Sequence, residues 1–269
     1  MAGAACRGWR PATRLGSPVS PLAGIQTQPL LIAVIVLLGL WLTAPSGAAA
    51  AQALLTPLAG AGDLPAAPWH VAGLPHQKKP LTRFALVDLD GRRALRVEAD
   101  ASYGNLVHPL QPAQPASTLA WVWRADQLVA GTDLRTKAGD DTTLKVCVFF
   151  DLPLDRVPFV ERQLLRLARS QSSEPLPTAT VCYVWDTSLA IGTAMDNAFT
   201  RRLRYIVLQN GVAPAQLWRR EQRDIGADFL LLFGDESTQV PAVVGVAVGA
   251  DADNTRGHGI GHVADLVLQ

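Results

Sequence analysis

Apolar and polar residues alternate with a period of two along most of the chain after residue 69. The clearest case is residues 82–99, where two alternating runs flank Asp90-Gly91, a dipeptide typical of a tight hairpin turn. In the second run, Leu95 and Val97 would face one side of a strand and Arg96 the other. Other runs rich in β-branched and aromatic residues predict further strands at residues 103–110, 118–126, 143–151, 180–186, 202–210, 240–250 and 261–268.

Two segments break this period and predict short helices. The first is residues 158–170, which has Pro158 near its start and gathers apolar side chains near one face. These side chains are Phe159, Leu164, Leu165 and Leu167. The second is residues 227–233, which ends at Gly234. Because strands outnumber helices and do not alternate with them, we predict an all-β fold with one or two short helices, a two-sheet antiparallel β-sandwich of jelly-roll type.

The first 53 residues have the order of a secretory signal peptide. Arginines precede an apolar run at residues 30–42, and small residues follow it. The run is shorter than the roughly 20 residues of a membrane-spanning helix, so we expect no stable membrane span after cleavage. A retained N-terminal anchor is the alternative. We predict a signal peptide at 1–53, a leader at 54–68 and a β-sandwich domain at 69–269, in an exported protein of the periplasm or the extracellular space.

Net charge bears on the class of partner, and the cysteines bear on whether the domain contains a disulfide. The chain carries a net charge of +1, so no basic excess indicates nucleic-acid binding. Two of its three cysteines, Cys147 and Cys182, lie in similar strand-like sequences of the predicted domain. In an oxidising compartment they would pair if neighbouring strands brought them within bridging distance. The sequence leaves open whether they form a disulfide or remain two buried thiols.

The loop at residues 133–141 carries acidic and basic side chains between two predicted strands. We interpret Arg135, Lys137, Asp140 and Asp141 as a candidate ligand or metal loop at one rim of the sandwich. The alternative is a solvated turn, whose surface ion pairs would contribute little to stability.

A second candidate loop, residues 251–262, begins D-A-D-N-T and continues with three glycines and two histidines. Asp251, Asp253 and Asn254 place side-chain oxygens near one another, as calcium loops do, although the glycine and glutamate of an EF-hand are missing. Calcium, bound by Asp251 and Asp253, is therefore a candidate cofactor, beside an organic-ligand loop or a bare turn. Zinc binding by the two histidines is disfavoured, because the glycines around them oppose a helix that would bring both to one face.

Tryptophans are the remaining candidate binding groups. Trp121, Trp123, Trp185 and Trp218 lie on or beside predicted strands. Aromatic ring faces complement the C–H groups of sugars, so Trp123 or Trp185 would serve as a stacking platform, with core filling as the alternative. The sequence contains no nucleophile elbow, P-loop or dinucleotide motif, and no catalytic residue is identified.

The order of four motifs resembles an exported bacterial family, the domain of unknown function numbered 3047. The motifs are R-T-K-A-G-D-D at 135–141, V-C-Y-V-W-D at 181–186, R-D-I-G-A-D-F-L-L-L-F-G-D at 223–235 and D-A-D-N-T at 251–255. The resemblance spans residues 69–268 and implies a single domain without an established activity. It also implies that both aspartate loops matter. The sequence departs from the family at G-H-G-I-G-H, residues 257–262, which puts any role of these histidines in doubt.

Three functions remain open at this point. The first is a non-catalytic module that binds a small molecule or a glycan through side chains of the two loops and a tryptophan: Arg135, Lys137, Asp140, Asp141, Trp185, Asp251, Asp253 and Asn254. The second is a cell-envelope saccharide hydrolase or lyase that uses a carboxylate pair from the same loops. The third is a structural or partner-binding envelope protein. The first two require the two loops to meet in space.

Overall fold

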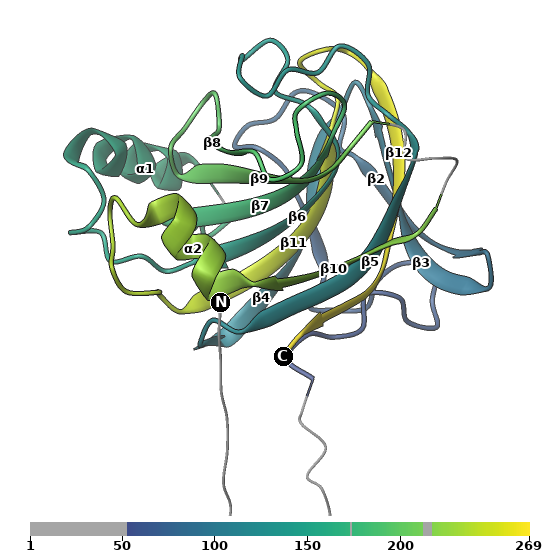
Figure 1. The fold of residues 1–269 in the computed structure, drawn as a ribbon, viewed down its shortest axis with the longest axis horizontal. Coiled ribbons are helices and arrows are strands. Elements are labelled where there is room, and N and C mark those ends of the chain that lie inside the picture. Colours follow the sequence, from purple (N-terminus) through teal and green to yellow (C-terminus); the bar gives the residue numbers. More distant parts are fainter. Residues whose placement is uncertain (1–52, 173, 212–216) are drawn as a thin grey trace, which may run out of the picture. The chain divides into compact units, whose positions relative to one another are not determined.

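Two β-sheets pack face to face in the computed structural model, which describes residues 53–172, 174–211 and 217–269 (Figure 1). The first sheet contains, in spatial order, β1 (His70–Ala72), β4 (Tyr103–Gln114), β11 (Val243–Asp251), β6 (Thr142–Phe150), β7 (Ala179–Asp186), β9 (Leu203–Asn210) and β8 (Ala194–Asp196). The second contains β10 (Arg219–Asp224), β5 (Thr118–Gln127), β12 (His258–Leu268), β3 (Arg92–Asp100) and β2 (Arg83–Leu89). Among these strands only β7 and β9 pair in parallel. The predicted two-sheet antiparallel β-sandwich is therefore confirmed, with one parallel pair that was not predicted from the sequence.

The β2–β3 hairpin forms where the alternation predicted it. Asp90 and Gly91 occupy the turn with φ values of 52° and 72°, as a tight hairpin turn requires. Leu95 and Val97 are fully buried, whereas Arg96 between them is half-buried on the other face of β3. Such alternation is strong only where one face of a strand meets solvent. In β7, by contrast, all eight residues are buried.

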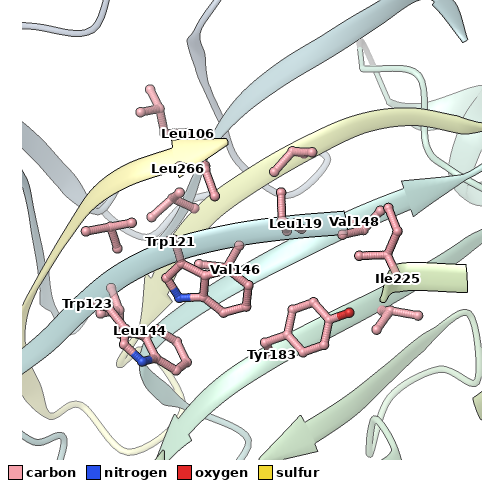
Figure 2. Close-up of a cluster of buried hydrophobic side chains, with 14 of the residues drawn as sticks. Leu106, Leu119, Trp121, Trp123, Leu144, Val146, Val148, Tyr183, Ile225 and Leu266 are labelled. Carbon is pink, nitrogen blue, oxygen red and sulfur yellow. The ribbon is translucent and has the colours of Figure 1, made fainter. Parts of the chain in front are cut away.

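Large aromatic side chains fill the space between the two sheets (Figure 2). Trp121 of β5 packs on Trp123 and on Tyr183 of β7, with ring centroids 5.5 and 5.3 Å apart. Trp123 in turn meets Trp185 of β7 at 5.6 Å. Trp185 is only 1% exposed and Trp123 is fully buried, so the prediction that either ring is a stacking platform is wrong. Both rings belong to the core, because their strands direct them at the facing sheet.

The predicted leader at residues 54–68 packs against the sandwich. Leu55 and Leu58 are buried in the main core cluster, and the indole of Trp69 donates to the carbonyl of Thr56. The predicted signal peptide lies almost wholly outside the described residues, since residues 1–52 are not among them. In the part of the chain that the structure describes, no helix is long and apolar enough to cross a bilayer.

Two helices accompany the sheets at one end (Figure 1). α2 (Ile225–Phe233) starts two residues earlier than predicted, because the Asp224 side chain accepts hydrogen bonds from the backbone of Gly226 and Ala227 and so caps its first turn. α1 (Phe159–Gln171) occupies the predicted segment. Of the four apolar residues that the sequence placed near one face of this helix, only Leu165 is buried.

Cys147 and Cys182 form a disulfide between β6 and β7. The two residues are directly opposite each other in the antiparallel register, which brings their Cα atoms to 4.1 Å. They lie in a second apolar cluster with Leu134, Val184 and Tyr205. Leu134 belongs to the loop at 133–141, so the disulfide lies in the layer that supports this loop. The question that the sequence left open is thereby answered in favour of pairing.

Candidate functional site

The two aspartate loops meet at one end of the seven-stranded sheet, because β6 and β11, which follow and precede them, are neighbours. Asp141 holds the second loop in place. Its Oδ1 accepts hydrogen bonds from the backbone and side-chain nitrogens of Asn254, and its Oδ2 accepts from the backbone and hydroxyl of Thr255. Asn254 also donates to the carbonyl of Asp140. The geometric requirement for a shared site is therefore met.

A buried ion pair lies beneath these loops. Nζ of Lys145 in β6 donates to Oδ2 of Asp251 at the end of β11, at 2.8 Å, and both residues are buried. Oδ1 of Asp251 accepts from the backbone and hydroxyl of Thr142. The ammonium also lies 4.9 Å from the ring centroid of Tyr103. Burial alone would lower the pKa of Lys145, but Asp251 outweighs it and raises the pKa above its usual range, so the lysine stays charged.

The carboxylate of Asp140, unlike that of Asp251, accepts hydrogen bonds only from neutral groups. Asn197 donates to Oδ2 at 2.5 Å and the hydroxyl of Tyr205 to Oδ1 at 3.1 Å. Burial, and then the charge of nearby Asp251, raise the pKa of Asp140 to about 6. Asp140 thus holds a carboxyl group that exchanges its proton close to neutral pH.

This raised pKa predicts an unusual pH dependence of stability. Below about pH 3 the carboxyl is mostly protonated in both states. Between the ordinary value of 3.8 and about 6, the unfolded chain ionises first, so the contribution of Asp140 to stability falls as the pH rises. Asparagine has no charge to lose or gain, so we expect the free energy of unfolding of Asp140→Asn to rise relative to the parent as the pH increases from 4 to 7. At about 1.4 kcal/mol per pKa unit, the total rise should be about 1–3 kcal/mol.

Urea unfolding of the parent and of Asp140→Asn from pH 4 to 7 measures the difference in their free energies of unfolding. Asp133→Asn is the matched control in the same loop. The side chain of Arg135 donates a hydrogen bond to Asp133 and lowers the pKa of that carboxyl. The contribution of Asp133 to stability therefore rises with pH, whereas that of Asp140 falls. A difference between Asp140→Asn and the parent that stays constant from pH 4 to 7 would contradict the prediction.

A polar cavity of about 360 Å³ lies at the rim above this support. Its lining residues are Lys79, Ala101, Asp253, Asn254 and Arg256. Nζ of Lys79 binds Oδ2 and the carbonyl of Asp253, both at 2.7 Å. The cavity therefore presents cationic donors, a carboxylate and an amide around one small volume.

The structure separates the predicted site residues into three groups. Asp253 and Asn254 line the cavity, whereas Asp140, Asp141 and Asp251 lie under it and fix the loops. Arg135 and Lys137 are exposed and lie elsewhere: Arg135 pairs with Asp133, and Lys137 lies over the ring of Phe199. Trp185 forms part of the core, as described above.

Sequence reasoning missed several residues of the site. Lys79 and Arg256 line the cavity, and Lys145, Asn197 and Tyr205 contact the buried carboxylates. Only Lys145 carried a usable signal, since a lysine within an apolar strand is rarely buried without an anionic partner. Arg256 is exposed with a φ of 56°, at the tip of the loop.

The contacts of Asp251 and Asp253 do not fit a calcium ion. Lys145 and Lys79 already neutralise these carboxylates, and both oxygens of Asp251 accept hydrogen bonds from the protein. Within residues 53–172, 174–211 and 217–269, no three His, Cys, Asp or Glu side chains gather in a way that could hold a metal ion. Calcium binding stays an untested prediction of the sequence, and these contacts give it no support.

Comparison with known proteins matches the chain to one family. The family model described as "Protein of unknown function (DUF3047)" matches residues 67–267. No curated protein matches the chain. Among solved structures, the Trichoderma harzianum endoglucanase 3 from family GH12 aligns with 74% of this chain and 96% of its own, at 9% identity and a TM-score of 0.36. A loop-swap mutant of Necallimastix patriciarum Xyn11A aligns with 70% and 87%, at 11% identity and a TM-score of 0.30. At these TM-scores neither likeness bears on function.

Proposed function

The chain belongs to the DUF3047 family of proteins of unknown function, and we propose that this member is a non-catalytic module that binds a small polar ligand, a saccharide, in the rim cavity. The observation that carries the proposal is the lining of this cavity. Lys79 and Arg256 are donors, Asp253 is an acceptor and Asn254 is both. Sugar hydroxyls are donors and acceptors at once, so a wall that mixes both kinds suits them.

The size and support of the cavity agree with this role. A volume of about 360 Å³ lies at the lower end of the range of small-molecule pockets, roughly 300–1,000 Å³. The loop that carries Asp253 and Asn254 is held by four hydrogen bonds to the Asp141 carboxylate. A loop that is fixed before the ligand arrives loses little conformational entropy on binding.

Hydrolysis by a carboxylate pair is less well supported. Asp140, with its pKa of about 6, has the property of a general acid. A second carboxylate would have to face the substrate or a water molecule. Asp251, whose charge acts on Asp140, has both oxygens engaged by Thr142 and Lys145. The pair therefore lacks a free nucleophile or base, and we favour binding.

We also propose that the protein is exported. The sequence of residues 1–53 supports export, and so does the Cys147–Cys182 disulfide, because disulfides persist in oxidising compartments and are rare in the cytosol. A saccharide of the cell envelope or the surroundings is then a ligand that the protein would meet.

Screening residues 50–269 on a saccharide array, followed by calorimetry with the best ligand, tests the binding proposal. This segment forms one compact unit and contains the whole described core. We expect Asp253→Ala and Arg256→Ala each to weaken binding about tenfold or more, since a hydrogen bond to a charged group contributes about 1.5–3 kcal/mol.

Arg135→Ala is the matched control, because Arg135 was a candidate from sequence but lies outside the cavity. Its affinity should equal that of the parent. The proposal fails if no saccharide binds, or if the cavity variants bind as well as Arg135→Ala. Release of reducing ends from the bound saccharide would instead make the module an enzyme.

A further inference from the structure

The amphipathic helix α1 is turned with its apolar face to the solvent. Phe159, Val160, Leu164 and Leu167 are 67%, 66%, 57% and 57% exposed. Their spacing places them along one face of the helix, which we call the α1 stripe. A core-facing helix would bury such a face. An apolar stripe that a domain leaves open indicates a surface that binds something else.

The opposite face of α1 attaches the helix to the domain. Leu165 is the buried apolar residue of the helix. Glu161, the only acidic residue of α1, lies 3.5 Å from the guanidinium of Arg202, and Arg169 donates two hydrogen bonds to the carbonyl of Leu176. These contacts fix the orientation of the helix, so the exposure of the stripe is a property of the fold.

The charges of α1 are distributed unevenly around this stripe. Arg162 and Arg166, four residues apart, lie along one edge of the stripe, whereas the guanidinium of Arg169 is directed at the carbonyl of Leu176. The guanidinium of Arg162 lies 5.9 Å from the ring centroid of Phe159 at that edge. The single glutamate is paired with Arg202 on the inner side. The outer side of the helix is thus apolar with a basic border.

We propose that α1 docks the domain on an anionic lipid bilayer. The α1 stripe would enter the boundary between headgroups and acyl chains, and Arg162 and Arg166 at its edge would lie at the phosphates, the arrangement of helices that lie in the membrane interface. α2 lies at the same end of the domain as α1 (Figure 1).

A second copy of the chain fits this surface less well. A stable protein interface buries about 800 Å² on each partner and involves roughly 20–30 residues a side. The α1 stripe offers four side chains on a helix of 13 residues. Its basic border would also face the basic border of a copy, whereas anionic lipid headgroups complement it.

Co-sedimentation of residues 50–269 with vesicles tests this proposal. One set contains phosphatidylcholine alone, and the other about equal parts of phosphatidylcholine and phosphatidylglycerol. We expect the parent to sediment with the anionic vesicles and to be released as salt is added. The triple variant Val160→Gln, Leu164→Gln and Leu167→Gln should lower the partition coefficient about tenfold or more, and Arg166→Glu about fivefold or more.

A second triple variant, Leu64→Gln, Leu74→Gln and Ile191→Gln, is the matched control, because these side chains are about as exposed but lie outside α1. It should bind like the parent. Thermal melts will show whether each variant is folded. The proposal is overturned if the parent stays in the supernatant when the anionic vesicles sediment. It is also overturned if the α1 triple variant binds these vesicles as well as the parent does. Analytical ultracentrifugation that finds a dimer in the parent and a monomer in the α1 variant would assign the stripe to a second copy.

Discussion

Lys145→Met is expected to lower the free energy of unfolding by about 3–5 kcal/mol, the usual cost of removing one partner from a buried ion pair. Lys145 is 2% exposed and Asp251 is 4% exposed, so neither charge is stabilised by water when the other is lost. The substitution keeps an unbranched apolar stem of four heavy atoms and removes the ammonium. It therefore reports mainly the unpaired charge of Asp251, and urea unfolding at pH 7 measures it.

The double variant Lys145→Met with Asp251→Asn removes both charges and should recover a large part of this loss. The neutral amide retains an oxygen that accepts the hydrogen bonds from Thr142. Arg135→Met breaks the exposed pair with Asp133 in the adjacent loop and should cost much less, because water and salt screen an exposed pair. If Lys145→Met were no more costly than Arg135→Met, the buried pair would not be what holds the ends of β6 and β11 together.

The strands could be predicted because their signal is local. In β2 and β3 every second residue faces solvent. The apolar Leu95 and the charged Arg96 therefore already indicate in the sequence which face of β3 is buried. The prediction for Trp185 failed where this signal was missing. All residues of β7 are buried, and such a run indicates burial on both faces without saying which side chains meet the other sheet. A continuous apolar run should therefore have favoured core filling for Trp185.

The orientation of α1 could not be predicted in the same way. The spacing of Phe159, Leu164 and Leu167 correctly indicated a helix, but period alone does not say whether the apolar face meets the core. The contacts that orient it are made with residues outside the helix, Arg202 and Leu176. A tertiary ion pair and hydrogen bonds to a backbone carbonyl therefore set the orientation of α1, and the spacing of its apolar residues does not reveal them.

The meeting of the two aspartate loops depends on topology. Asp141 and Thr255 are 114 positions apart in the sequence, and they touch because β6 and β11 are neighbours in the first sheet. Motif order had singled out both loops without locating them in space. Asp141 and Asp251 are buried and support the loops, whereas Asp253 lines the cavity. All three are aspartates, so the residue type alone does not reveal which of them are buried.

The disulfide supports the same loops from the side of β7. Cys147 and Cys182 pack against Leu134 of the first loop and Tyr205, the residue that donates to Asp140. The bridge also joins positions 35 residues apart. Restricting a loop of that length in the unfolded chain stabilises the folded state by about 4 kcal/mol in the chain-entropy account. The covalent link and the candidate site are therefore parts of one structural unit.

Replacing both cysteines with alanine in residues 50–269 should thus cost about 3–4 kcal/mol and lower the melting temperature by about 8–15 °C. Adding reductant to the parent should have a similar effect, and adding it to the variant should have none. The chain outside this segment contains the third cysteine, Cys6, so thiol titration of the segment counts only the bridging pair. Two free thiols in the folded parent, or a melting temperature that reductant leaves unchanged, would remove both the stabilisation and the structural support for export.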